Sequence, residues 1–254
     1  MGAQLLRQAH LASRDIQIAL LATGFKTTMG THGAKIEDEW HVNVLPPNTR
    51  RALDFLAQEE WLKQSHWYLA GGTALALQAG HRVSVDLDFF TEDRDFENSA
   101  LFAAFSHVGH DWNVDVDRKN TVYGTLFGAK ISFIAYPFFI PDQEPHWYGS
   151  IRVLDTRDIA VMKIVAISQR GRKRDFFDLY WCAQHVEPLE AIIRRLKKQY
   201  PSVAHNYHHI LKALVYFEDA ETDPDPVVRF DATWREVKTF FRKEVKNIAL
   251  RLIG

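Results

Sequence analysis

The stretch that decides the fold is residues 67–90, which read WYLAGGTALALQAGHRVSVDLDFF. The apolar run at its start predicts a buried strand. Gly71 and Gly72 then form a turn, and residues 73–78 form a short helix. Residues 83–90 alternate in polarity and predict a second strand. The order strand, glycine turn, helix and strand is typical of an α/β unit.

Two carboxylates, Asp86 and Asp88, share one face of that second strand, because side chains alternate along a strand. Residues two apart lie about 7 Å from each other, so both groups can bind one hard divalent cation. The apolar neighbours Leu87, Phe89 and Phe90 favour either exposure of the pair or a bound metal, since burial without one costs roughly several kcal/mol. Mg²⁺ is the expected ion, with Mn²⁺ as an alternative, because Mg²⁺ completes a small carboxylate set with phosphate oxygens and water.

The glycine pair supplies a complementary site for phosphate. Gly71 and Gly72 stand where a strand ends and a helix begins, and N–H groups at a helix N-terminus attract anions. Thr73 adds a hydroxyl donor, and Arg82 and Ser84 follow shortly afterwards in the chain. A triphosphate and a metal would therefore lie between the two elements.

Beyond this stretch the pattern divides into two halves. The first half adds predicted helices at 48–63 and 97–106 and predicted strands at 112–117, 121–127 and 130–137. The second half is all helical, with helices predicted at 156–170, 174–185, 187–200, 203–217 and 232–252. We therefore predict an α+β (α/β) fold with a mixed sheet, followed by helices. The predicted parts are a poorly anchored extension at 1–40, an α/β domain at 41–154 and a helical domain at 155–254.

The bulk composition limits the classes of protein. A chain of 254 residues that is 46% hydrophobic can bury a substantial core. Its net charge of −1 gives no global attraction to nucleic acid or membranes, so a nucleic acid would be held by a local patch. The single cysteine, Cys182, excludes an internal disulfide. Because no apolar run reaches the roughly 20 residues that span a bilayer and no signal peptide is evident, we expect a cytoplasmic protein without a membrane partner.

A cluster of four cations surrounds Gly171 at a predicted helix boundary and consists of Arg170, Arg172, Lys173 and Arg174. It is the best local candidate for contact with phosphate or an RNA backbone, although such a run can also be simply solvated.

Three nearby charged residues lie on predicted helices. Lys163 could reach phosphates or remain solvated. Asp175 and Asp178 are three positions apart on one helix face, so either could orient an arginine or a substrate. The spacing does not choose between the two aspartates.

Residues 69–77 and 81–90 together resemble the signature of the AbiEii/AbiGii toxin family of nucleotidyltransferases. The later segment 163–180, which ends in RGRKRDFFDLY, resembles the second half of that family. The similarity spans about residues 42–185 and leaves both ends of the chain outside.

This resemblance implies a polymerase β-like minimal nucleotidyltransferase fold and a helical domain that closes the nucleotide cleft. It implies metal-dependent transfer of a nucleoside monophosphate from a nucleoside triphosphate (NTP) to an acceptor, which for several members is thought to be the 3′ end of tRNA. It also implies a toxin with a cognate antitoxin as partner. By position, Gly72, Thr73 and Ser84 would bind phosphate, and Asp86 and Asp88 would bind metal.

The same resemblance implies a second pair of essential positions, Lys163 with either Asp175 or Asp178. Gly71, Arg82 and Arg174 complete the predicted nucleotide-binding set.

One feature departs from the family pattern. Polymerase β-like enzymes often supply a third metal-binding carboxylate from a neighbouring strand, but residues 128–135 contain no acid. Asp115 and Asp117, on an earlier predicted strand, could substitute or could be plain exposed residues. The number of metals therefore stays open, and so does a catalytically silent nucleotide-binding protein of the same fold. A further alternative is an antibiotic-type nucleotidyltransferase acting on a small molecule, which would require an acidic acceptor cleft.

Overall fold

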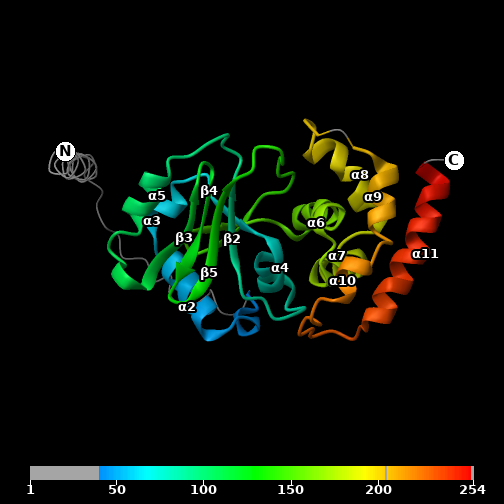
Figure 1. Ribbon diagram of the computed structural model, residues 1–254, viewed down its shortest axis with the longest axis horizontal. Coiled ribbons are helices and arrows are strands. Elements are labelled where there is room, and N and C mark those ends of the chain that lie inside the picture. The colour runs from blue at the N-terminus through cyan, green and yellow to red at the C-terminus, as the bar shows by residue number, and fades with distance from the viewer. Residues whose placement is uncertain (1–39, 204, 253–254) are drawn as a thin grey trace. The chain divides into compact units, whose positions relative to one another are not determined.

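A computed structural model describes residues 40–203 and 205–252, all within one compact unit (Figure 1). The predicted N-terminal extension lies outside the described residues, apart from Trp40, whose side chain is buried. The predicted boundary between residues 154 and 155 stays a prediction, although every element after this point is a helix.

A mixed sheet of seven strands forms the first half, in the order β3-β4-β5-β2-β1-β7-β6. The strands are β1 (Tyr68–Ala70), β2 (Leu87–Thr91), β3 (Trp112–Arg118), β4 (Thr121–Leu126), β5 (Ala129–Ala135), β6 (His146–Tyr148) and β7 (Ile151–Val153). β2 lies between β1, to which it is antiparallel, and β5, to which it is parallel. The predicted mixed sheet and α+β class are confirmed.

The helices of the first half are α2 (Pro47–Leu56), α3 (Glu60–Lys63), α4 (Gly71–Ala79) and α5 (Asn98–Ala104), with 3₁₀ turns at Val42–Val44 and Gly109–Asp111. Those of the second half are α6 (Thr156–Arg170), α7 (Lys173–His185), α8 (Leu189–Gln199), α9 (Tyr207–Ala213), α10 (Glu218–Glu221) and α11 (Trp234–Leu252). α4 contacts β1 and β2 as well as α6 and α7, so it joins the sheet to the helical half (Figure 1). No helix in the described part of the chain is long and apolar enough to cross a membrane.

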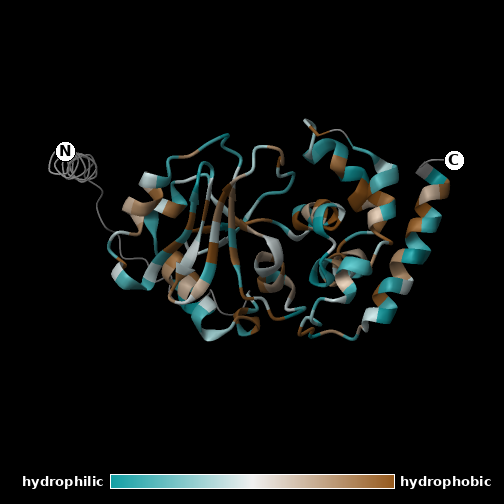
Figure 2. Cartoon of the chain, in the orientation of Figure 1, coloured by the Kyte–Doolittle hydropathy of each residue, from teal (hydrophilic) through white to brown (hydrophobic). Residues whose placement is uncertain are grey.

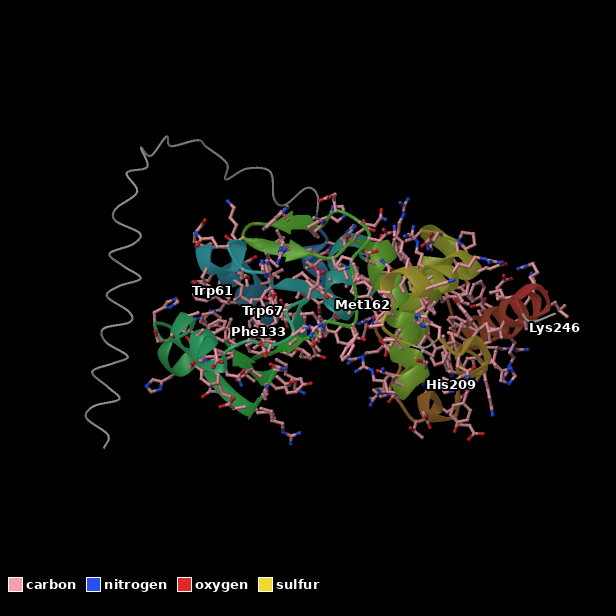
Figure 3. The ribbon with its side chains drawn as sticks, turned by 90° about the horizontal axis from the view of Figure 1, so that it is seen from above. Trp61, Trp67, Phe133, Met162, His209 and Lys246 are labelled. Atoms are coloured by element: carbon pink, nitrogen blue, oxygen red, sulfur yellow. The ribbon has the colours of Figure 1, made fainter. Side chains whose placement is uncertain are left out.

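One face of the sheet packs an aromatic core. Phe89 on β2 and Phe133 on β5 are partners in register and stack with centroids 5.1 Å apart. Trp67 meets Phe133 edge-on at 5.1 Å, and Trp61 lies beside them (Figure 3). Because side chains alternate along a strand, burial of Phe89 turns Asp88 to the opposite face.

The helical half has an apolar core of its own. Val237, Phe241 and Val245 recur every four residues on α11 and are buried, which gives the helix its alternating brown and teal turns in Figure 2. Phe241 meets Phe176 of α7 at 5.5 Å. This packing fixes α7, which carries several of the predicted site residues.

Four predictions of local structure were wrong in detail. The strand expected at 83–90 begins only at Leu87, because Val83 N–H bonds to the distant Val227 carbonyl instead of a neighbouring strand. The short strands β6 and β7 were not predicted. The helix expected at 203–217 is shortened to α9, and α10 begins after it at Glu218. The helix expected at 48–63 is divided into α2 and α3.

Candidate active site

A cavity of about 270 Å³ lies where the N-terminus of α4, strand β2 and helices α6 and α7 meet. It brings together eleven of the fourteen predicted site residues, namely Gly71, Gly72, Thr73, Arg82, Ser84, Asp86, Asp88, Lys163, Arg170, Arg174 and Asp175. The other three, Asp178, Arg172 and Lys173, do not line it.

The two glycines at the start of α4 serve different purposes. Gly71 has a φ of +69°, a backbone conformation that favours glycine, and a Cβ atom there would lie 3.0 Å from Asp88 Oδ2. A Cβ atom at Gly72 would lie 2.2 Å from Arg82 Nη2. The glycine pair therefore lets a carboxylate and a guanidinium approach the helix N-terminus, where free N–H groups favour an anion.

Thr73 ties this helix to the segment that bears the carboxylates. Its hydroxyl lies 2.8 Å from Ser84 Oγ and also bonds to the Asp86 carbonyl oxygen. These contacts occupy the hydroxyl within the protein, so the predicted donation from Thr73 to a phosphate would require one of them to open. Ser84 lines the cavity as well and is the better placed hydroxyl.

Asp86 and Asp88 both line the cavity but differ in environment. Asp86 lies just before β2 and accepts a hydrogen bond from Arg174 Nη1 at 3.2 Å. Asp88 is the second residue of β2 and accepts one from Ser132 Oγ at 2.8 Å. Burial raises the pKa of Asp88, although the Ser132 bond acts in the opposite direction.

Asp86 and Asp88 can bind a cation whose other ligands come from the substrate. Ser132 stands opposite Asp88 on β5, where a third acid was missing from the sequence. Within the described residues, no three His, Cys, Asp or Glu side chains form a metal site. Mg²⁺ suits a pair because it takes its remaining ligands from phosphates and water. Asp86 and Asp88 therefore suit a metal ion that is coordinated by both protein and substrate, and they do not supply all of its ligands.

Beneath the cavity lies a buried set of charges from both halves. Arg82 donates from Nε and Nη2 to the two oxygens of Asp178, at 2.6 and 2.8 Å. Lys163 Nζ lies 2.7 Å from Asp175 Oδ1 and 2.6 Å from Asp178 Oδ2. His81 Nε2 lies 2.7 Å from Asp178 Oδ1. Two cations and two carboxylates balance in charge, as groups removed from water must.

The pKa values follow from this pairing. Burial alone would lower the pKa of Lys163, but Asp175 and Asp178 outweigh burial and leave it raised. Burial would raise the pKa of Asp178, but Arg82 and Lys163 hold it well below its usual range. Burial lowers the pKa of His81 despite its bond to Asp178. Lys163 is therefore a firmly protonated cation at the cavity wall.

The geometry separates the two aspartates that sequence spacing left open. Both Asp178 oxygens are engaged by buried partners, and the residue does not reach the cavity. Asp175 lines the cavity, and its Oδ2 has no hydrogen bond within the described residues, with Arg170 Nε 3.5 Å away. Asp178 is thus positioned to hold Arg82 and Lys163, whereas Asp175 faces the site.

The basic cluster around Gly171 divides in the structure. Arg172 donates to Asp223 at 2.9 Å, and Lys173 donates to the Asp223 carbonyl and to Asp225, at 2.7 and 3.0 Å. These two cations hold the acidic segment that follows α10, and their predicted contact with RNA stays a prediction. Arg170 and Arg174, which line the cavity, keep about half of their side chains exposed.

An apolar and aromatic wall of the cavity was missed by sequence analysis. It consists of Phe90, Tyr123, Ile134, Tyr136, Met162, Val165, Ala166 and Tyr200, with Gln169 beside them. Met162 lies where α6 meets the sheet half (Figure 3). Phe90 shares the face of Asp88, and its β5 partner is Ile134. Alternation along β2 and β5 would have predicted these apolar residues beside Asp88, but only with the register of the two strands known.

The C-terminal region also reaches the site. Val83 N–H donates to the Val227 carbonyl at 2.9 Å, and Arg229 N–H donates to the His81 carbonyl at 2.7 Å. These two bonds flank Arg82, which itself forms a bridge with Val228. The segment that leads into β2 is therefore held by residues far along the chain.

A carboxylate pair at the start of β2, a glycine-rich helix N-terminus and cations from two following helices surround one cavity on a mixed sheet. This fold and site define a nucleotidyltransferase. The model of the AbiEii nucleotidyl transferase toxins of type IV toxin–antitoxin systems matches residues 54–123 and 122–249, and the chain belongs to this family. The match extends well beyond the predicted limit near residue 185.

The chain is also similar to individual proteins. The protein aq_aa25 of Aquifex aeolicus strain VF5 is 36% identical over 185 residues, which cover 71% of this chain and 87% of that protein. JHP933 from Helicobacter pylori has a similar fold, with a TM-score of 0.51 and 20% identity over 82% of this chain and 94% of its own. MenT4, a nucleotidyltransferase toxin from Mycobacterium tuberculosis, gives a TM-score of 0.48 and 17% identity over 82% of this chain and 87% of its own.

Proposed function

We propose that this protein transfers a nucleoside monophosphate from an NTP to the 3′ end of an RNA, with tRNA as the acceptor, and acts as the toxin of a toxin–antitoxin pair. The observation that carries the proposal is the single cavity that joins Asp86 and Asp88 to the N-terminus of α4 and to Lys163 and Arg174.

The donor triphosphate fits the polar end of the cavity. The N–H groups at Gly71 and Gly72 and the Ser84 hydroxyl would hold its oxygens. Lys163 and Arg174 supply positive charge against the pyrophosphate that leaves. The opposite wall, which contains Phe90 and Tyr136 with ring centroids 5.7 Å apart, offers a surface on which the nucleobase can stack.

The chemical step is an in-line substitution at phosphorus. The acceptor hydroxyl oxygen forms a bond to the α-phosphorus and its proton passes to solvent, while the bond from that phosphorus to pyrophosphate breaks and its electron pair leaves with pyrophosphate. Asp86 and Asp88 would hold Mg²⁺ or Mn²⁺, which lowers the pKa of the hydroxyl and neutralises the leaving group. Asp178 acts indirectly by fixing Arg82 and Lys163 under the site.

Family membership supports the toxin role and an antitoxin partner, because the matching family is one of toxin–antitoxin systems. The RNA acceptor is supported by Arg170 and Arg174, exposed cations that remain at the cavity rim. A location in the cytoplasm, where tRNA is present, is part of the same proposal.

A second candidate is transfer to a small hydroxylated molecule of the antibiotic type. It is favoured by Asp115, which lines a neighbouring cavity together with Asp86 and Asp88 and makes that cavity acidic. The catalytically silent alternative is favoured by Ser132, which stands in place of a third acid.

The test is incubation of the purified protein with Mg²⁺ and each of the four labelled NTPs in turn, with either total tRNA or an aminoglycoside as the acceptor. Label in tRNA from one triphosphate would support the proposal and name the donor. Label in an aminoglycoside but not in tRNA would favour the small-molecule candidate, and no label in either would favour the silent one.

A further inference from the structure

A second cavity, of about 200 Å³, adjoins the first over strands β3, β4 and β5. It shares Asp86, Asp88 and Tyr123 with the first cavity. Its other lining residues are Asp115, Gly124, Lys130, Ile131 and Ser132. The two carboxylates at the centre of the site therefore face two cavities.

The chemistry of transfer requires two such spaces. In an in-line substitution the attacking oxygen and the leaving pyrophosphate lie on opposite sides of the α-phosphorus. The pyrophosphate end belongs with the N-terminus of α4, Lys163 and Arg174, all of which line the first cavity alone. The attacking group must therefore approach from the other side of Asp86 and Asp88, where the second cavity lies.

The lining of the second cavity matches the parts of a nucleotide. The Tyr123 side chain, 44% exposed, offers a flat ring on which a base can stack. Lys130 is exposed and makes no ion pair within the described residues, so its ammonium group can contact a phosphate. Lys130 and Ser132 are two apart on β5 and share one face of the sheet.

Asp115 supplies a hydrogen-bond acceptor in the same cavity. The register of β3 against β4 shifts between Val114 and Val116, so Asp115 is the extra residue of a β-bulge. Bulges next to active sites redirect a side chain. A carboxylate repels a free phosphate but accepts hydrogen bonds from ribose hydroxyls, so the cavity suits a nucleotide better than an isolated anion.

We propose that the second cavity binds the 3′-terminal nucleotide of the RNA acceptor, with its base on Tyr123, its phosphate at Lys130 and its ribose hydroxyls near Asp115. This inference rests on the proposed function and assigns the acceptor side of that site. Tyr123 and Lys130 are binding and positioning residues, and neither takes part in bond making.

The test compares Tyr123→Ala and Lys130→Met in the full-length protein, with fluorescently labelled total tRNA as the probe in anisotropy measurements. Tyr123→Ala should raise the Kd for tRNA by roughly 5- to 150-fold, the loss expected for one stacked base. Lys130→Met should raise the Kd and lower the slope of log Kd against log salt by about one. Because Lys130 does not line the first cavity, its variant should leave the Kd for NTP unchanged.

Trp147→Ala and Lys246→Met serve as matched controls, because both residues are exposed and neither lines the first or the second cavity. Lys246 lies on α11, at the far end of the helical half from the sheet (Figure 3). The inference predicts that the controls bind tRNA as the wild type does. Loss of tRNA binding in the controls but not in the Tyr123 and Lys130 variants would overturn it, and so would unchanged tRNA binding in all four. Wild-type protein that binds tRNA but transfers no label would contradict the proposed function, while the binding comparison would still decide the inference.

Discussion

Arg82 and Asp178 form a bidentate ion pair, at 2.6 and 2.8 Å, that joins the segment before β2 to helix α7. Both side chains are buried, and the guanidinium passes directly against Gly72 at the start of α4. Asp178 also pairs with Lys163, so one carboxylate holds a cation from each half of the molecule. The wall of the cavity is thus held by charged side chains that are almost entirely buried.

Asp178→Asn should lower the free energy of unfolding by about 3–5 kcal/mol, because it leaves Arg82 and Lys163 buried without a full counter-charge. Urea denaturation followed by circular dichroism would measure the change. Asp225→Asn is the matched control, since Asp225 is 77% exposed and its partner Lys173 keeps a second hydrogen bond, to the Asp223 carbonyl. The control should change stability by no more than about 1 kcal/mol. Equal effects of the two substitutions would contradict a buried ion pair.

The stability that Asp178 provides should also depend on pH. Its pKa lies well below the ordinary value of 3.8, so the unfolded chain takes up this proton more readily than the folded one. The contribution is therefore complete above about pH 3.8 and is lost as the pH falls through the lower, folded pKa. The stability difference between wild type and Asp178→Asn should stay constant at neutral pH and shrink only below about pH 4. If the stability difference between the two proteins instead became smaller as the pH rose, the pKa of Asp178 could not be lowered by folding.

Gly72→Ala should abolish transfer, because its Cβ would lie 2.2 Å from Arg82 Nη2 and would push the guanidinium away from Asp178. Gly109→Ala is the control, since a Cβ there meets nothing within 4 Å, although its φ is +64°. We expect the control to lose roughly 1–2 kcal/mol of stability from backbone strain and to keep its activity. The measurement is transfer of label to tRNA by each of the two variants. An active Gly72→Ala protein would show that Arg82 can move without loss of function and would contradict this prediction.

Asp175→Asn should lower kcat by about 100-fold or more, a typical loss when one positioned polar group is removed from an active site. Its cost in stability should be smaller than that of Asp178→Asn, because Asp175 has one oxygen without a hydrogen bond. Parallel kinetics and urea denaturation of both variants test this division. Wild-type kcat in Asp175→Asn, or a loss of stability in that variant as large as in Asp178→Asn, would contradict this division.

The sequence indicated the parts of the site that depend on local pattern. The strand, glycine and helix order of residues 68–79 holds, as does the helix at 156–170. Asp86 and Asp88 do line one cavity, but Asp86 precedes the strand instead of lying on it. Local alternation could not show this, because Val83 and Ser84 bond to distant backbone groups.

Other features depend on contacts between distant residues and left no local signal. β6 and β7 are three residues each, too short for alternation to be recognised. Arg172 and Lys173 pair with Asp223 and Asp225, which lie about 50 residues further along the chain and come close only in the folded protein. For the same reason, spacing alone could not decide between Asp175 and Asp178, which differ in what surrounds them.

The central claim is that Asp86 and Asp88 hold the metal for nucleotidyl transfer, and it is tested most directly by Asp86→Asn and Asp88→Asn. Asp95→Asn is the control, because Asp95 is exposed and does not line the cavity. The measurement is Mg²⁺-dependent transfer of label from the accepted NTP to tRNA, with circular dichroism to confirm folding. We predict no transfer by either cavity variant and wild-type transfer by the control. Full activity in a folded Asp86→Asn or Asp88→Asn protein would contradict the claim.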